Sequence, residues 1–257
     1  MAATELPAAI AQLASALADL PGVEAVVLGG SRATGEHRPD SDWDLGLYYR
    51  ASHGSFDPAA LRELGHDGYV SALGEWGPIV HGGAWLTVDG MPVDVIFRDL
   101  DTVERWLREA EAGRFEVLVQ NGSIVGAPTY AVVGELAICR PLFGELPRPA
   151  FPDALAAGAA TWWSGRAAVS LMFAAGYAES GDAVCCTGML VDAALCTAHA
   201  RLAERREWGL NEKRLLQRAG LGELQRLLAP GAAGDAGLPA TVAAVSAILR
   251  VDPLRAR

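Results

Sequence analysis

The chain has 257 residues, of which 51% are hydrophobic and 20% are charged. This composition excludes an intrinsically disordered chain and predicts a folded globular protein. Twenty-one Lys and Arg residues stand against 31 Asp and Glu residues, a formal charge of −10. Because nucleic-acid binding depends on neutralising phosphates with basic side chains, this balance argues against DNA or RNA as a partner and favours a cationic or neutral small molecule.

The four cysteines form no CxxC pair and have no histidines at zinc-ligand spacing, so we expect free thiols in a reducing compartment. The N-terminus lacks the basic and long apolar regions of a signal peptide, which predicts a cytoplasmic protein. The apolar stretch 154–176 is interrupted by Arg166, and we expect a buried helix there and no membrane span.

The first hundred residues mix helix and strand signals. Apolar residues recur at helical spacing from Ile10 to Leu20, and Asp89-Gly90 is typical of a hairpin turn between two short strands. The predicted elements are a helix over 10–20, strands over 25–28 and 42–49, a helix over 57–68, and strands over 84–88 and 92–97.

After Asp99 the patterns are helical, and no convincing strand follows. The predicted helices span 100–112, 130–140, 152–177, 182–205, 211–219 and 240–249, with a loop over 230–239. The helix over 182–205 is apolar almost all round, which is typical of the central helix of a bundle. We therefore predict an α+β chain with a catalytic domain over 1–125, built on a mixed β-sheet flanked by helices, and an all-α helical bundle over 126–257.

The most informative segment runs from Leu28 to Tyr49. A strand ends in Gly-Gly-Ser, and a second strand then carries Asp42 and Asp44 two residues apart, which places both carboxylates on one face. Two ionised carboxylates side by side repel each other, and a hard cation such as Mg²⁺ would offset that repulsion.

A third acid, Asp94, lies in the otherwise apolar strand Pro-Val-Asp-Val-Ile-Phe, where an isolated charge would be costly. If this strand lies beside the Asp42 and Asp44 strand, the three carboxylates can hold one or two metal ions. Gly30 lets the backbone approach a polyphosphate, and Ser31 begins a helix whose free N–H groups favour anions.

These residues resemble the signature of the polymerase-beta-type nucleotidyltransferase superfamily: Gly30-Ser31, then Asp42-Trp43-Asp44, then Asp94 on a later strand. The signature covers about the first hundred residues. A catalytic domain followed by a helical bundle is similar, in architecture only, to the antibiotic nucleotidyltransferases that modify aminoglycosides or lincosamides.

The resemblance implies transfer of a nucleoside monophosphate from an NTP, with ATP the expected donor, to a hydroxyl of a small molecule. Asp42 and Asp44 would hold Mg²⁺, Gly30 and Ser31 would bind the β- and γ-phosphates, and Asp94 would be a metal ligand or a base. Arg32 is either a triphosphate contact or a solvated loop arginine. Lys213 would meet the triphosphate from the bundle, as a lysine does in some two-domain adenylyltransferases.

Other side chains carry weaker signals. Trp43 and the pair Trp162-Trp163 are packing residues or an aromatic wall for a sugar or base. Asp192 lies centrally in an apolar helix, seven residues before His199, so the two are candidates for a buried polar pair.

Two alternative functions stay open. The chain could transfer AMP to a protein, as antitoxin nucleotidyltransferases do, although no arginine precedes His199 at the spacing of the partner toxin's motif. It could also be a nucleotide sensor without turnover, against which the three retained carboxylates argue.

Overall fold

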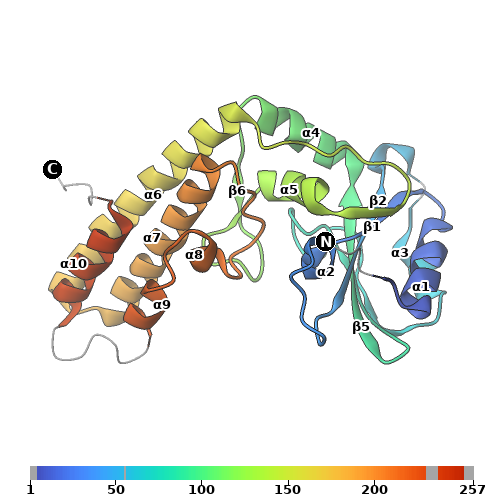
Figure 1. Ribbon diagram of the computed structural model, residues 1–257, viewed down its shortest axis with the longest axis horizontal. Coiled ribbons are helices and arrows are strands. Elements are labelled where there is room, and N and C mark those ends of the chain that lie inside the picture. The colour runs from blue at the N-terminus through green and yellow to red at the C-terminus, as the bar shows by residue number, and fades with distance from the viewer. Residues whose placement is uncertain (1–4, 55, 230–236, 252–257) are drawn as a thin grey trace. The chain divides into compact units, whose positions relative to one another are not determined.

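A computed structural model describes residues 5–54, 56–229 and 237–251 (Figure 1). Contacts within the chain divide it into two compact units, which we call the first and the second unit. The first unit comprises Met1–Glu109, Glu116–Gly122 and Ala127–Ala150. The second unit comprises Ala110–Phe115, Ser123–Gly126 and Phe151–Arg257.

Among the described residues, six strands of the first unit form one sheet in the order β3-β4-β5-β2-β1-β8. β2 and β5 run parallel and the other neighbours run antiparallel, so the sheet is mixed, as predicted. The strands are β1 Val23–Leu28, β2 Trp43–Tyr49, β3 Asp67–Val70, β4 Gly83–Val88, β5 Met91–Asp99 and β8 Arg140–Phe143.

One face of the sheet carries the hydrophobic core because alternate residues of β2 and β5 are apolar. Leu45 and Val95 are fully buried there, in one cluster with the apolar stripe of α1 (Ala8–Ala18) and with Leu61 of α3 (Pro58–Arg62). The predicted stripe of the first helix is therefore confirmed, since it fills this core.

The opposite face is covered along part of its length by α5 (Tyr130–Ile138). Glu135 of α5 accepts two hydrogen bonds from the buried guanidinium of Arg98 in β5, from Nε at 2.7 Å and from Nη2 at 2.8 Å. The remaining short elements of this part of the chain are α2 Gly30–Thr34, a 3-10 turn Ala51–His53, α4 Leu100–Glu111, β6 Val117–Leu118 and β7 Ala127–Pro128.

The predicted hairpin turn is confirmed between β4 and β5. Asp89 and Gly90 both have positive φ values, 50° and 74°, as a two-residue turn that matches the strand twist requires. This turn sets the register of β4 against β5 and so decides which residue of β4 lies next to Asp94.

The second unit is a helical bundle built around the hairpin of α6 (Asp153–Ser180) and α7 (Ala183–Glu204) (Figure 1). The side chain of Asp182 begins α7 by accepting a hydrogen bond from the Cys185 amide at 3.0 Å. The shorter helices are α8 Leu215–Arg218, α9 Leu224–Leu227 and α10 Gly237–Leu249.

Helix α7 is buried almost continuously from Leu190 to Ala203, which confirms it as the central helix. It is also long and apolar enough to cross a membrane, but 61% of the apolar window is buried within the protein. A buried bundle helix passes the same length and composition test, so this is weak evidence for a membrane span.

Three sequence predictions are corrected. A strand does follow Asp99, because Arg140–Phe143 pairs with β1 as β8, and its proline is tolerated at a sheet edge.

The predicted helices also differ in length from the observed ones. The helix predicted over 57–68 ends at Arg62, and Gly65, three residues later, turns the chain with a φ of 75°. The helix predicted over 211–219 is reduced to α8. Residues 230–236 of the predicted loop lie outside the described residues, and residues 237–239 belong to α10.

Candidate active site

Two of the three acids are direct neighbours across parallel strands. Asp44 of β2 is in register with Asp94 of β5, and Asp42 lies just before β2. The flanking residues Trp43 and Val93 are buried in the core. Because side chains alternate along a strand, Asp44 and Asp94 must then lie on the other face of the sheet, where both are partly exposed. Asp42 is exposed.

The Gly-Gly-Ser turn closes against Asp44. The amide of Gly29 donates a hydrogen bond of 2.8 Å to the carbonyl oxygen of Asp44. Gly30 has a φ of 56°, and a Cβ atom there would lie 1.8 Å from Oδ2 of Asp44. Only glycine therefore fits, and α2 begins at this point with Ser31 in its first turn, as predicted.

Arg32 braces the loop that carries Asp42. Its Nε donates to the carbonyl oxygen of Asp42 at 3.1 Å and its Nη2 donates to that of Ser41 at 2.5 Å. The guanidinium also lies 4.0 Å from the centroid of the Trp43 ring, and only 8% of Arg32 is exposed. Through these contacts Arg32 and Trp43 stabilise the loop that carries Asp42. A contact of Arg32 with the triphosphate stays a prediction.

Comparison with known proteins agrees with this geometry. Residues 10–104 match the family model of the nucleotidyltransferase domain. Residues 10–104 therefore form a nucleotidyltransferase domain. The match covers α1 to the start of α4, and so includes Gly30, Asp42, Asp44 and Asp94.

No curated protein matches the chain. Among solved structures, a nucleotidyltransferase-like protein from Exiguobacterium sibiricum 255-15 is similar, with a TM-score of 0.46 and 11% sequence identity. The similarity covers 94% of this chain and 72% of that protein.

Side chains alone do not complete a metal-ion site in the described part of the chain. Within residues 5–54, 56–229 and 237–251, no group of three or more His, Cys, Asp or Glu side chains could hold a metal ion. Mg²⁺ commonly takes one or two carboxylates and completes its shell with substrate phosphates and water. The oxygen donors of the neighbouring Asp44 and Asp94 suit that mode, and Mg²⁺ itself stays a prediction.

Lys213 belongs to the second unit, where it is exposed in the turn before α8. Its amide donates to Oδ1 of Asn211 at 2.9 Å. The adjacent Glu212 fastens this turn, because its carboxylate accepts from the amides of Ile124 and Val125, both at 2.8 Å. The contact of Lys213 with a triphosphate stays a prediction.

A buried polar network crosses the bundle, but not between the residues expected. Asp192 accepts hydrogen bonds from Nη2 of Arg166 at 2.5 Å and from Oγ of Ser170 at 2.6 Å. His199 instead stacks on Trp163 with ring centroids 4.5 Å apart, and its Nδ1 has no hydrogen-bond partner among the described residues. The expected pairing of Asp192 with His199 is therefore wrong. Burial, with the nearby charge of Arg166, lowers the pKa of His199 to about 4.

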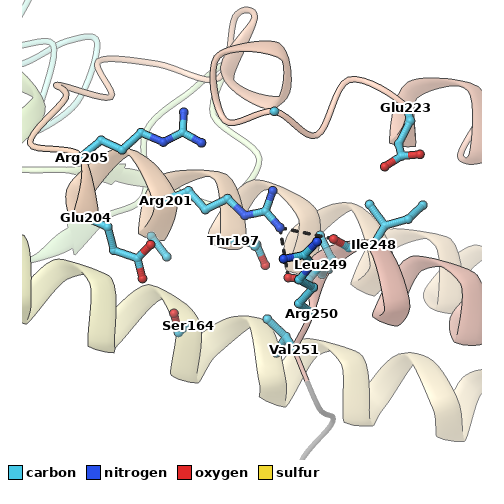
Figure 2. A pocket seen from close by; sticks show the side chains of 12 residues that line it. Ser164, Thr197, Arg201, Glu204, Arg205, Glu223, Ile248, Leu249, Arg250 and Val251 are labelled. Carbon is cyan, nitrogen blue, oxygen red and sulfur yellow. Dashed lines mark hydrogen bonds between the residues drawn. The ribbon is translucent and has the colours of Figure 1, made fainter.

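A cavity of about 530 Å³ in the second unit was not anticipated from the sequence (Figure 2). Arg201, Arg205, Arg250, Glu204 and Glu223 line it together with smaller side chains. Burial and the charges of the other two arginines lower the pKa of Arg201. The guanidinium of Arg201 donates to carbonyl oxygens at the end of α10, so it ties α7 to α10, and we assign the cavity no part in nucleotidyl transfer.

Proposed function

We propose that the chain transfers a nucleoside monophosphate, with ATP as donor, to a hydroxyl group of a small molecule and releases pyrophosphate. The observation that carries this proposal is the register of Asp44 with Asp94 on one face of the sheet, with the Gly29-Gly30 turn closed against Asp44. A phosphate-binding turn and paired carboxylates at one point are the parts that phosphoryl transfer requires.

Each part has a defined task in the proposed reaction. The N–H groups of Gly30 and Ser31 would hold the β- and γ-phosphates. Asp42, Asp44 and Asp94 would hold one or two Mg²⁺ ions together with triphosphate oxygens, since in the described part of the chain the three carboxylates do not form a metal-binding group by themselves. Bound Mg²⁺ would neutralise phosphate charge and make the acceptor hydroxyl easier to deprotonate.

In the transfer step the acceptor oxygen forms a bond to the α-phosphorus while the bond from that phosphorus to the bridging oxygen breaks. Pyrophosphate leaves with the electron pair of that bond. The hydroxyl proton passes to Asp94 or to water, depending on whether Asp94 acts as base or as ligand. Arg32 supports the loop of Asp42, and Lys213 neutralises triphosphate charge.

The acceptor we propose is a small hydroxylated molecule, and an aminoglycoside-like antibiotic or a related metabolite fits best. The formal charge of −10 favours a cationic acceptor through electrostatic complementarity. The chain has fewer Lys and Arg residues than Asp and Glu residues, which also argues against a nucleic-acid acceptor.

The experiment measures pyrophosphate release from each of the four NTPs with Mg²⁺, using aminoglycosides, lincosamides and simple sugars as acceptors. Asp42→Asn is the inactive variant, and Asp40→Asn, an exposed loop acid two residues away, is the matched control. We expect release that needs one acceptor class, Mg²⁺ and Asp42 but not Asp40. Release that survives in Asp42→Asn, or labelling of lysate proteins in place of small molecules, would contradict the proposal.

A further inference from the structure

Four side chains form a row across the sheet at the level of the carboxylates. Tyr69 of β3 is in register with Trp85 of β4, Trp85 with Asp94 of β5, and Asp94 with Asp44 of β2. Residues in register lie on the same face of a sheet, so two aromatic rings and two carboxylates share one face. The local sequence around Trp85 does not indicate this position, because only the pairing of β4 with β5 places Trp85 beside Asp94.

The aromatic half of this row is a solvent-exposed surface. Trp85 is 55% exposed and Tyr69 is 43% exposed. Trp76 stacks against Trp85 with centroids 4.6 Å apart and planes 21° apart, and the Tyr69 ring lies 5.9 Å from that of Trp85. We call these three rings the aromatic platform.

Gly83 and Gln120 fix the position of Trp76 in the platform. Trp76 lies over Gly83, where a Cβ atom would approach its ring to 2.6 Å, so glycine makes the room. The side chain of Gln120 donates to the carbonyl oxygen of Trp76 at 2.8 Å and accepts from the Val80 amide at 3.2 Å. A surface fixed in this way loses little entropy when a ligand stacks on it.

The platform also has an acidic rim. Glu75 accepts hydrogen bonds from the hydroxyl of Tyr69 and from the amide of Ala72. These bonds lower the pKa of Glu75, which keeps it ionised near neutral pH. With Asp94 on the other side, carboxylates flank the exposed indole of Trp85, and aromatic faces beside acids attract cations.

The order of the strands separates the two substrates. The phosphate-binding turn follows β1, on one side of the carboxylates, and the aromatic platform lies on β4, on the other side. In an in-line displacement the leaving pyrophosphate and the attacking hydroxyl are on opposite sides of the phosphorus. If the triphosphate lies on the β1 side of the carboxylates, the acceptor must therefore approach from the β4 side.

We propose that the aromatic platform binds the acceptor, and that the acceptor carries a cationic, hydroxylated ring that stacks on Trp85 with a hydroxyl directed to Asp94. Neighbouring strands are about 4.8 Å apart, which matches the breadth of a six-membered ring reaching from Trp85 to Asp94. This inference rests on the proposed function and adds the acceptor's site and shape.

Steady-state kinetics of Trp85→Ala and Trp85→Phe test the platform, with Phe173→Ala, an aromatic residue of the second unit that is 50% exposed, as the control. In Trp85→Ala we expect the acceptor KM to rise about tenfold while the NTP KM stays within about twofold. Trp85→Phe should recover part of the loss, and Phe173→Ala should leave both values unchanged.

A binding measurement separates this proposal from the proposed function. Indole fluorescence is titrated with glucosamine, which has a ring, and with glucosaminitol, its reduced open-chain counterpart, in the presence of a non-hydrolysable ATP analogue and Mg²⁺. Saturable quenching by glucosamine that is weaker for glucosaminitol and lost in Trp85→Phe would support the platform even if no acceptor is turned over.

Three results would overturn the proposal. An unchanged acceptor KM in Trp85→Ala would remove the platform from the acceptor site while leaving nucleotidyl transfer intact. A rise in the NTP KM alone would assign the rings to the nucleobase. Dissociation of a dimer in Trp85→Ala, with no change in ring binding, would make the platform a contact between copies of the chain.

Discussion

Gly30 is the residue at which backbone conformation and chemistry depend on each other most closely. In Gly30→Ala the new methyl group would collide with the Asp44 carboxylate and would also strain a φ of 56°. We expect loss of transferase activity and a fall in the free energy of unfolding of about 1–2 kcal/mol, measured by urea denaturation. Gly54→Ala is the control, because its φ is 63° but nothing lies within 4 Å of the added Cβ. It should lose stability but keep activity, and equal activity in both variants would contradict the prediction.

His199 predicts a pH dependence of stability. Its pKa falls from 6.5 in the unfolded chain to about 4 in the fold, because burial disfavours the charged ring. The unfolded chain therefore takes up the proton first as pH falls, and stability present above pH 6.5 is lost progressively down to about pH 4. We expect a slope of up to about 1.4 kcal/mol per pH unit in this window. His199→Phe should flatten this component in urea denaturation at a series of pH values, and an identical slope in both proteins would refute it.

Among the elements, α5 is joined to the sheet by an ion pair between Arg98 and Glu135 in addition to its buried side chains. Arg98 is 5% exposed and Glu135 is 36% exposed, so Glu135→Ala leaves a buried guanidinium without its carboxylate partner. We expect a loss of about 3 kcal/mol in thermal or urea unfolding. Glu104→Ala, which breaks a partly exposed pair with Arg50, should cost less than about 1 kcal/mol. Similar losses in the two variants would mean that the buried Arg98 pair stabilises the protein no more than the pair of Arg50.

The turn before α8 gives a second prediction at this scale. Glu212 fastens the turn of Lys213 to the loop 123–125, so Glu212→Ala should free that turn. If Lys213 meets the triphosphate, Lys213→Ala and Glu212→Ala should each raise the NTP KM about tenfold with little change in the acceptor KM. Glu207→Ala, nearby and exposed to a similar degree, is the control. A normal NTP KM in Lys213→Ala would remove this lysine from the site.

The elements differ in how far the sequence could predict them. β2 and β5 were predictable because their apolar residues alternate, and the hairpin before β5 because Asp89-Gly90 favours one turn type. β8 was not, because a four-residue edge strand containing Pro141 carries no periodicity and is a strand only through its pairing with β1. Long-range pairing of this kind leaves no local signal.

At the scale of the whole molecule, some parts of the candidate site could be predicted from the sequence and others could not. The carboxylates were predictable because a charge in an apolar strand is costly unless a partner or a ligand offsets it. The glycine turn was predictable because a short apolar strand ends directly in Gly-Gly-Ser. Trp85 was not, because an exposed tryptophan gains meaning only when the register places it beside Asp94. The structural contacts of Arg32 were also hidden, since they are made to carbonyl groups of a loop.

The measurement that tests the central claim most directly is the mass of the acceptor after incubation with the 257-residue chain, ATP and Mg²⁺. The account predicts that the acceptor gains the mass of one AMP unit, that one pyrophosphate appears per product, and that neither occurs in Asp94→Asn. An acceptor of unchanged mass while ATP is consumed, or full modification by Asp94→Asn, would contradict nucleotidyl transfer at these carboxylates.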